Sequence, residues 1–447
     1  MRHFRMWRWS IPVLVVAGAG VLFERSISAA ESGGTVGAAQ APTFTKDVAP
    51  ILQRACQNCH RPGSIAPMSL LTYKDARPWA RSMKQKVAER DMPPWYIDRH
   101  VGIQKFKDDA GLTEQEIATI VRWVDNGSPE GNAADMPPPL KFEELGKWHI
   151  KPDLIVTATP YTVKPEQPDQ WLDFYVDSGL TEDRYIKEIE GMPSYPDGFR
   201  VVHHAHQYLI PPGAEGGEGM GREQTLNEYA VGKNADMFPE GSGRLIKAGT
   251  KIHFNLHYHA IGKEVTDAFK LGLVFYPKGV VPKHIEITET IGSNPETLDI
   301  PPGADNVRSD AYHRFAKPVK LTAFQPHMHN RGKRECLEAM YPDGRSEMLN
   351  CAAFNFGWAL VYNYADDVAP LLPAGTILHV INWHDNSPSH PGNPDPRAWV
   401  GWGNRTSDEM SFSWVSWYEM TNEEFKQEVE ARRAQSKLSA NRSPAQR

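Results

Sequence analysis

The sequence predicts a multidomain protein in which a small all-α domain precedes two all-β sandwich domains of jelly-roll-like form. The chain has 447 residues, and this length suggests two to four domains. Its 35 Gly and 36 Pro suit a turn-rich β protein better than a bundle of helices. Helical patterns lie mainly before residue 135, whereas short alternating runs separated by Pro and Gly begin near residue 145.

The composition narrows the class of protein. Hydrophobic residues make up 40% of the chain and charged residues 23%, as expected of a folded protein. Four cysteines are too few to staple a chain of this length. The formal net charge of -6 argues against nucleic acid as the main partner.

The N-terminus has the pattern of a secretory signal peptide. Three arginines precede a 13-residue apolar run at 11–23, and small residues follow at 28–30. We therefore predict a signal peptide at 1–30, a flexible linker at 31–42, and a periplasmic or secreted protein with no stable membrane insertion after cleavage. An uncleaved membrane anchor is the alternative.

The predicted α domain, residues 43–135, contains a haem-attachment signature. Cys56-Gln57-Asn58-Cys59-His60 has the form C-x-x-C-H. This spacing lets two thiols add to the haem vinyl groups while the histidine reaches the iron. A lone C-x-x-C could be a redox or zinc motif, but the histidine and the signal peptide favour one covalently attached haem c.

Two helices are expected to frame this motif. One leads into it at 46–55, and an amphipathic helix at 113–126 closes the domain. Thr113 is the expected N-cap of the closing helix with Glu116 three residues later, and Gly127 is the expected stop.

The sixth iron ligand is predicted to be a methionine, a soft ligand that raises the reduction potential. Met92 is preferred, because prolines in Asp91-Met92-Pro93-Pro94-Trp95 would hold its loop rigid. Met68 is the alternative. The motif, the Met-Pro-Pro-Trp segment and the closing helix together resemble small c-type cytochrome domains.

Two short recurrences indicate a duplication in the β part. Ile-Pro-Pro-Gly-Ala occurs at 210–214 and 300–304, and Ala-Gly-Thr-x-x-His occurs at 248–253 and 374–379. We therefore predict related sandwich domains at 145–295 and 296–425, followed by a tail at 426–447 that frays after a helical start.

Histidines are concentrated in three short clusters that hold eight of the 17 in the chain, at 203–206, 253–259 and 327–329. In the strand expected over 249–260, His253, His257 and His259 share one face. Buried imidazoles each need a partner, so such a face is unusual as plain packing.

The other two clusters differ in spacing. His327 and His329 would project from one strand face, whereas adjacent His203 and His204 need a bulge or a strand end to share an ion. Imidazole suits Zn, Cu, Ni or Fe, and a thioether ligand would favour copper.

The order of four motifs resembles the copper type II, ascorbate-dependent monooxygenases, which include the peptidylglycine- and dopamine-hydroxylating enzymes. These motifs span about 150–420 and are His203-His204, Leu256-His257-Tyr258, His327-x-His329 and Ser407-Asp408-Glu409-Met410.

The resemblance implies two copper ions. An electron-storing copper would be held by His203, His204 and His257. An oxygen-binding copper would be held by the catalytic ligands His327, His329 and Met410. The implied activity is that of an oxidoreductase, in which R–H, O2, two electrons and two protons give R–OH and water.

The resemblance also bears on the substrate. The peptide-amidating members read a peptide carboxylate with Arg two residues before the His-x-His, and with Asn and Tyr two and four residues after the Met. This chain has Gln325, Phe412 and Trp414 there, so no cation is left to pair with a carboxylate. A more apolar or aromatic small molecule is expected.

The remaining histidines and cysteines are expected to be structural. His253 and His379 occupy the same place in the recurrence and should serve packing, whereas His206 and His259 should lie beside a metal site or at the surface. Cys336 and Cys351 flank a hairpin turn and could form a disulfide in an oxidising compartment, or remain buried thiols.

The fused haem segment departs from ascorbate-dependent relatives. It suggests that electrons from an external donor pass through haem to the copper of His203, His204 and His257. Two alternatives remain, namely a non-catalytic copper/haem electron-transfer protein and a copper oxidase or lyase.

Overall fold

The computed structural model describes residues 41–64, 66–107, 109–142, 146–214, 224–230, 235–358, 360–403 and 405–440. The chain divides into two compact units, Met1–Gln40 and Ala41–Arg447, and every described residue belongs to the second. The predicted signal peptide at 1–30, its anchor alternative and nearly all of the linker at 31–42 lie outside the described residues. Within the described ranges, every helix is too short or too polar to span a bilayer.

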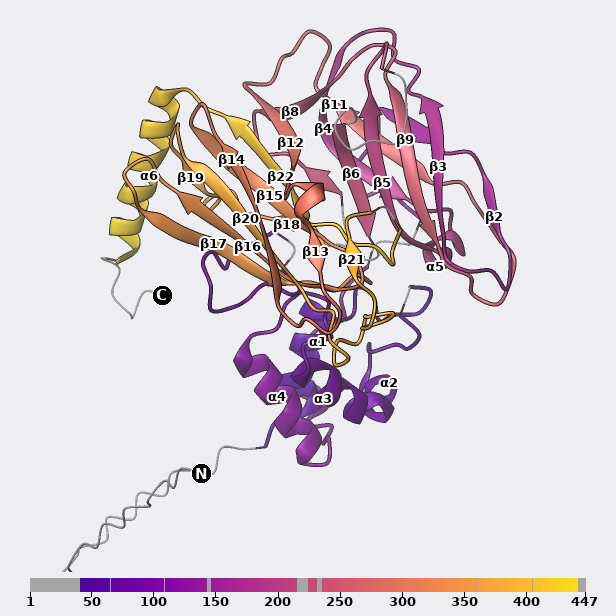
Figure 1. The fold of residues 1–447 in the computed structure, drawn as a ribbon. Coiled ribbons are helices and arrows are strands. Elements are labelled where there is room, and N and C mark those ends of the chain that lie inside the picture. The colour runs from indigo at the N-terminus through magenta and orange to yellow at the C-terminus, as the bar shows by residue number, and fades with distance from the viewer. Residues whose placement is uncertain are drawn as a thin grey trace, which may run out of the picture. The chain divides into compact units, whose positions relative to one another are not determined.

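The protein is mostly β, with several antiparallel sheets and a small N-terminal helical region (Figure 1). The helical region comprises η1 (Phe44–Val48), α1 (Ala49–Ala55), α2 (Tyr73–Ala76), η2 (Arg77–Trp79), α3 (Ala80–Ala88), α4 (Glu114–Asp125) and η3 (Ala133–Asp135). It buries its own apolar cluster, which includes Phe44, Leu52, Ile120 and Trp123.

Helix α4 matches the expected closing helix. Thr113 is its N-cap and forms a capping box with Glu116, as predicted. Gly127 follows the helix with φ +85°, a left-handed conformation that glycine adopts without a Cβ clash. The expected helix at 46–55 is present as a π-helical turn, η1, that continues into α1.

Two four-stranded sheets and one ten-stranded sheet form most of the β part. The first four-stranded sheet has the order β3 (Gln170–Asp177), β9 (Lys251–Tyr258), β5 (Val202–Ile210), β6 (Gln224–Ala230). The second has the order β14 (Val307–Arg314), β20 (Ile377–His384), β16 (Gly332–Met340), β17 (Ser346–Ala353).

The ten-stranded sheet runs through both predicted sandwiches. Its order is β1 (Leu154–Thr157), β11 (Lys270–Phe275), β4 (Arg184–Met192), β8 (Ser242–Ile246), β12 (His284–Gly292), β22 (Phe412–Glu419), β15 (Val319–His327), β18 (Tyr362–Asn363), with β7 (Asp236–Met237) on β4 and β19 (Leu371–Leu372) on β15. A short parallel contact between β8 and β12 joins its two halves.

Smaller elements complete the described chain. They are the strand pairs β2 (Tyr161–Val163) with β10 (Val265–Asp267) and β13 (Asp299–Ile300) with β21 (Val400–Gly401), the helices α5 (Gly198–Val201) and α6 (Asn422–Ala440), and the turn η4 (Pro295–Thr297). Lys320 pairs with Glu428 of α6 at 2.8 Å, and Arg432 donates to the Ala369 carbonyl. The tail predicted to fray at 426–447 is therefore helical as far as Ala440 and contacts the β part as far as Arg432, and 441–447 lie outside the described residues.

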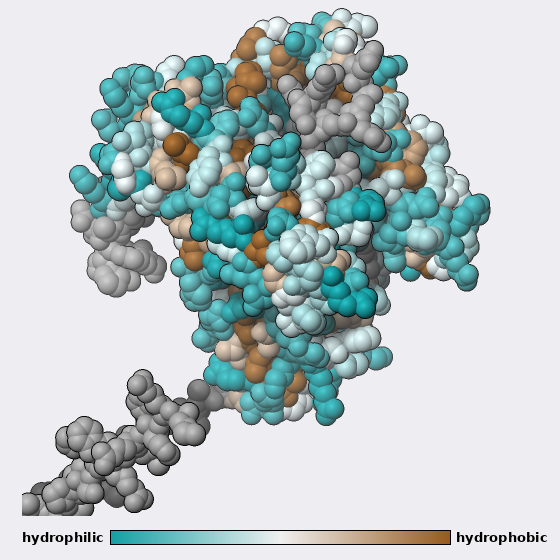
Figure 2. Space-filling view, in the orientation of Figure 1, coloured by the Kyte–Doolittle hydropathy of each residue, from teal (hydrophilic) through white to brown (hydrophobic). Residues whose placement is uncertain are grey.

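Each half of the β part has its own apolar core. The core of the first half includes Ile252, Phe254, Leu256 and Tyr258, the residues that alternate with the histidines along β9. The visible surface is largely hydrophilic, with apolar residues in small separate groups (Figure 2). Apolar burial in these cores is the main stabilising contribution.

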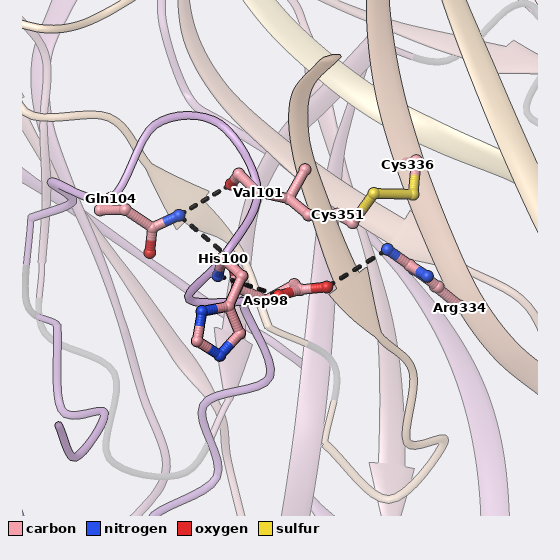
Figure 3. The surroundings of a disulfide bond; sticks show 7 residues. All are labelled: Asp98, His100, Val101, Gln104, Arg334, Cys336 and Cys351. Carbon is pink, nitrogen blue, oxygen red and sulfur yellow. Dashed lines mark hydrogen bonds and ion pairs between the residues drawn. A yellow bond between two sulfur atoms is a disulfide. The ribbon is translucent and has the colours of Figure 1, made fainter. Parts of the chain in front are cut away.

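The segment 95–107, which follows α3, packs onto the second half of the β part. Ile97 and Phe106 belong to the core of that half, and Ile97 and Ala352 form a β-bridge. The Asp98 amide donates to the Cys351 carbonyl at 2.8 Å. The Asp98 carboxylate pairs with Arg334, beside the disulfide (Figure 3).

That disulfide joins Cys336 of β16 to Cys351 of β17, which are cross-strand partners. This confirms the bond predicted across the hairpin. Disulfides persist in oxidising compartments, so the bond indicates an environment outside the cytoplasm.

Candidate metal centres

Three histidines from two adjacent strands converge in the first sheet. His203 and His204 lie on β5 and His257 lies on β9, with one ring nitrogen of each within 4.8 Å of the others. The β5–β9 register shifts between Val202 and His204, which is the irregularity that adjacent histidines need in order to face one ion. The arrangement can hold a metal ion in three imidazoles.

These rings are neutral at physiological pH. Burial lowers the pKa of His203, lowers that of His204 well below its usual value, and lowers that of His257 to about 4. Mutual repulsion among the rings adds to the lowering for His204 and His257. Neutral imidazole is the form that binds a metal. The Nδ1 atoms of His203 and His204 lie 2.9 Å apart, so one of them carries the proton of a hydrogen bond between the two rings.

One nitrogen of His257 has the properties of a ligand atom. Its Nε2 donates to the Asp169 carboxylate at 3.1 Å, which leaves Nδ1 unprotonated. That Nδ1 is buried and has no hydrogen-bond partner among the described residues. The Trp171 ring stacks on His257 with centroids 4.5 Å apart and holds the ring plane. A carboxylate on the far nitrogen is the usual support of a metal-binding imidazole.

Neighbouring histidines are held by carboxylates instead. His259 is exposed and bonds the other oxygen of Asp169 at 2.8 Å. His253 bonds Asp173 at 2.8 Å and stacks on Tyr175, as the structural role predicted for it requires.

His379 repeats the arrangement of His253 in the second half of the chain. It bonds Asp310 at 2.7 Å and stacks on Tyr312. Both histidines stand opposite an Asp-x-Tyr tyrosine in the neighbouring strand. The Ala-Gly-Thr-x-x-His recurrence thus marks equivalent strands in the two halves. The Ile-Pro-Pro-Gly-Ala recurrence does not, because its first copy follows the Asp-x-Tyr segment of the first half, whereas its second copy precedes the Asp-x-Tyr segment of the second half.

The second histidine pair lies at the end of β15. His327 is the last residue of that strand and His329 lies beyond it, so a strand face does not carry both rings as expected. Their ring centroids are nevertheless 5.5 Å apart. Burial lowers the pKa of His329 and lowers that of His327 well below its usual value. The His329 ring donates from Nδ1 to the Asp408 carbonyl at 3.2 Å, and the Arg405 backbone also contacts the ring.

Met410 lies in the apolar neighbourhood of His327. It forms a buried cluster with Phe412 and Trp414. Phe412 stacks on the His327 ring at 4.4 Å, and Trp414 lies 4.9 Å from the same ring.

Buried hydrogen bonds, called here the polar clamp, join the segment that carries His329 to the segment that carries Met410. The sequence did not predict this clamp. The Glu409 carboxylate accepts from the backbone amides of His329 at 2.8 Å and Arg331 at 2.6 Å. His384 donates from Nε2 to the Met410 carbonyl at 3.0 Å. Glu409 and His384 are fully buried. Only the neighbouring Asp-Glu-Met pattern could have pointed to Glu409, and nothing in the sequence singled out His384.

Trp414 also approaches the first group of histidines. Its ring lies 5.3 Å from His206, whose ring is 5.6 Å from His204. His327 contributes to the lowered pKa of His204, after burial and three nearer histidines. His206 is buried beside Glu228 rather than exposed, and its place beside a metal site stays a prediction.

The haem-motif residues lie at the end of α1. Cys56 and Cys59 are unpaired thiols, and burial raises the pKa of Cys56 to about 12. His60 donates from Nδ1 to the Met68 carbonyl at 3.3 Å, which leaves its Nε2 available. Met68 packs against the same core as Cys56.

Met92 lies in a different setting. It lines a cavity of about 360 Å³ together with the side chains of Arg90, Arg99 and Arg334. Met68 is thus tied to the motif through His60, whereas Met92 faces a cavity whose arginines pair with Glu114, Asp109 and Asp98. Both methionines remain candidates for the sixth ligand.

Comparison with known proteins gives no family. No family model and no curated protein matches the sequence. Remote structural likenesses include N-glycanase F (PNGase F), with 8% identity over 60% of this chain and 96% of that chain and a TM-score of 0.27. PNGF-II shows 10% identity over 60% and 66% with a TM-score of 0.24. Bacillus subtilis oxalate decarboxylase OxdC shows 9% over 63% and 80% with a TM-score of 0.13. Likenesses at this level carry no argument about function.

Proposed function

We propose that the protein is a copper-dependent monooxygenase that hydroxylates a C–H bond of a small organic substrate with O2. In this proposal residues 43–135 form a cytochrome c-like domain. Residues 145–295 and 296–425 form two jelly-roll-like sandwiches that resemble the copper type II, ascorbate-dependent monooxygenases. The protein acts in the periplasm or outside the cell.

One observation carries the proposal. His203, His204 and His257 bring three neutral ring nitrogens within 4.8 Å of one another, at the positions that the resemblance assigns to one copper. The buried, unpartnered Nδ1 of His257 fits a metal ligand, because such an atom otherwise costs free energy.

A second copper is assigned to His327, His329 and Met410. Support comes from the 5.5 Å separation of the two rings and from the clamp of Glu409, which holds the backbone amides of His329 and Arg331. A thioether in an apolar cluster is a weak, soft ligand that favours reduced copper.

Bound copper would supply one-electron redox chemistry toward O2, so that R–H, O2, two electrons and two protons yield R–OH and water. The protein's own residues orient the histidine ligands and exclude water from the two proposed copper sites. Asp169 fixes the tautomer of His257, the Asp408 carbonyl fixes that of His329, and Phe412 and Trp414 exclude water beside His327.

Haem c is assigned to Cys56, Cys59 and His60, with Met92 or Met68 as sixth ligand, and would supply a tethered one-electron carrier. The unpaired thiols and the free Nε2 of His60 fit this group. Attachment on the same chain supports haem as the donor to the first copper, because tethering raises the effective concentration of the electron carrier.

Metal analysis with electron paramagnetic resonance tests the class. Purified protein is expected to hold two copper ions with type 2 signals and one low-spin haem. Copper bound at one site only, or zinc in both, would reject the proposal.

Met410→Ala separates the monooxygenase from a non-catalytic electron-transfer protein. It is expected to abolish O2-dependent product while haem reduction by an external donor continues. Met340→Ala, at a partly exposed position, is the matched control. Unchanged product formation in Met410→Ala would exclude the assigned oxygen site.

Rapid mixing tests the haem assignment separately. Cu(II) in the first site should oxidise reduced haem on the same chain faster than it oxidises reduced haem on a separate molecule. Equal rates would remove haem from the electron path and leave the copper proposal standing.

The substrate positions predict a further result. Gln325, Phe412 and Trp414 offer no cation to a peptide carboxylate, so glycine-extended peptides should not be amidated. Amidation at an ordinary enzymatic rate would contradict this.

A further inference from the structure

A cavity of about 640 Å³ lies beside the candidate metal centres. Its walls come from β6, β7 and β8 on one side and from β12, β15 and β22 on the other. Trp414 lines it, and the same ring lies 4.9 Å from His327. The cavity is therefore one side chain away from the second histidine pair.

The buried charges around the cavity already have partners. Arg244 donates to the carbonyls of Thr225 and Leu226 and to the Thr288 hydroxyl. Glu286 accepts from the hydroxyls of Ser242 and Thr322, both at 3.0 Å. Arg244 also lowers the pKa of Glu286, whose overall rise comes from burial. A charged ligand would thus find neither Arg244 nor Glu286 free to act as its ion partner.

Two buried amides are left with unused hydrogen-bonding capacity. Asn227 Oδ1 and Gln325 Nε2 have no partner among the described residues, and both side chains line the cavity. The orientation of Asn227 is fixed, because its Nδ2 donates to the Asp236 carboxylate, which can only accept. Asn227 is 5% exposed and Gln325 is 4% exposed, so bulk water does not satisfy them.

The other walls combine apolar side chains with charged ones, which include Lys107, Glu228, Glu240 and Asp366. Leu226, Phe238, Phe324 and Trp414 line the same space. A ligand that fits this lining has an apolar or aromatic body and a neutral group that both accepts and donates hydrogen bonds.

We propose that this cavity binds a neutral organic molecule of that kind, an aryl or alkyl alcohol or a similar compound, through the amides of Asn227 and Gln325. The binding site itself needs no metal. It rests on the proposed function in one respect, namely that this ligand is the molecule to be hydroxylated.

Four probes of nearly equal size test which functional group the cavity prefers, in the whole protein without metal. They are benzyl alcohol, benzylamine, benzoate and toluene, measured by calorimetry and by quenching of tryptophan fluorescence. Benzyl alcohol should bind at least tenfold more tightly than each of the other three. Tighter binding of benzoate or benzylamine, or no binding of any probe at millimolar concentration, would overturn the proposal.

Three variants locate the site. Asn227→Ala and Gln325→Ala should each weaken benzyl alcohol binding about tenfold, whereas Asn306→Ala, at an exposed position, should leave it unchanged. Gln325→Glu keeps the side-chain size and should shift the preference toward benzylamine, because a carboxylate attracts an ammonium group. Wild-type affinity in both alanine variants would also overturn the proposal.

Binding and oxidation are then compared in the metal-loaded protein. Benzyl alcohol that binds through the two amides without O2-dependent product would reject the proposed function and keep the cavity. Product formation that Asn227→Ala and Gln325→Ala do not affect would keep the function and reject the cavity.

Discussion

Asp169 shows how one surface carboxylate can organise a metal site. Its two oxygens bond His257 and His259, which lie two residues apart in the chain. The bond to His257 selects the tautomer with an unprotonated Nδ1, so the carboxylate would act on a bound metal without touching it.

Asp169→Asn is therefore expected to weaken copper binding to the first site by about ten- to a hundredfold. Competitive titration with a chelator measures this affinity. Asp173→Asn is the matched control, because Asp173 holds His253, outside the three-histidine group. Equal affinities in the two variants would show that Asp169 does not support the ligand.

Glu335 is a buried carboxyl group that no proposed step uses. It is fully buried, and among the described residues neither carboxyl oxygen has a partner in hydrogen-bonding geometry. Burial raises its pKa well above the usual value, and Ser413 offsets only part of that rise. Its cross-strand partner Asn382 has an equally unpartnered Oδ1. A proton on Glu335 lets one of these groups donate to the other.

This proton makes stability depend on pH. Above the usual carboxyl pKa of 4.5, the unfolded chain releases the proton and the folded chain keeps it, so the free energy of unfolding falls as pH rises. Glu335→Gln should remove this dependence and raise the free energy of unfolding at pH 7 by about 1–3 kcal/mol. Below pH 4 the two proteins should be equally stable.

Urea unfolding at pH 7 and below pH 4 measures both quantities. Glu296→Gln, at an exposed position, should change neither. A Glu335→Gln protein that is less stable than wild type at pH 7 would mean that the carboxylate is charged and paired.

At the scale of elements, β9 was predictable because apolar residues and histidines alternate along the strand, so that one pattern places each set on its own face. Ile252, Phe254, Leu256 and Tyr258 are all fully buried, and the histidines occupy the other face. The α4 capping box was predictable for a similar reason, since Thr113 and Glu116 are close in the sequence. Local periodicity and local hydrogen bonds can be read from the sequence.

Contacts between distant segments could not be read in this way. The clamp of Glu409, Arg331 and His384 joins residues more than 20 positions apart, and each is a polar residue that ordinarily lies at the surface. Position alone also misplaced His329 on β15, because an alternating pattern does not show where a strand ends.

The β16–β17 hairpin depends on its disulfide. The bond closes a 15-residue separation, for which the chain-entropy estimate gives about 3 kcal/mol. The double variant Cys336→Ala, Cys351→Ala should lose about 2–4 kcal/mol of unfolding free energy. It should also loosen the segment 95–107, since Val101 packs against the disulfide.

Urea unfolding and hydrogen exchange measure these two effects. Wild type under reducing denaturation provides the reference, because it too unfolds without the cross-link. Unchanged exchange over 95–107 would show that this segment does not depend on the bond.

At the scale of the whole molecule, the predicted domain boundaries do not coincide with the boundaries of the apolar cores. Ile97 and Phe106 were predicted within the domain 43–135, yet they pack in the core formed by the strands beyond residue 296. Likewise β12, predicted before the boundary at 295, pairs along most of its length with β22. Composition shifts gave the approximate divisions, but only three-dimensional packing shows which residues share a core.

Two phenylalanines make this difference measurable. Phe106 stacks on Tyr364 at 5.2 Å in the β core, whereas Phe44 lies in the helical core at 6.0 Å from Trp123. Replacement of either by Ala should cost about 3–5 kcal/mol, as expected for a buried Phe. Hydrogen exchange should accelerate in β15–β18 for Phe106→Ala and in α1, α3 and α4 for Phe44→Ala. If Phe106→Ala accelerated exchange only in the helices, the segment 95–107 would belong to the helical region after all.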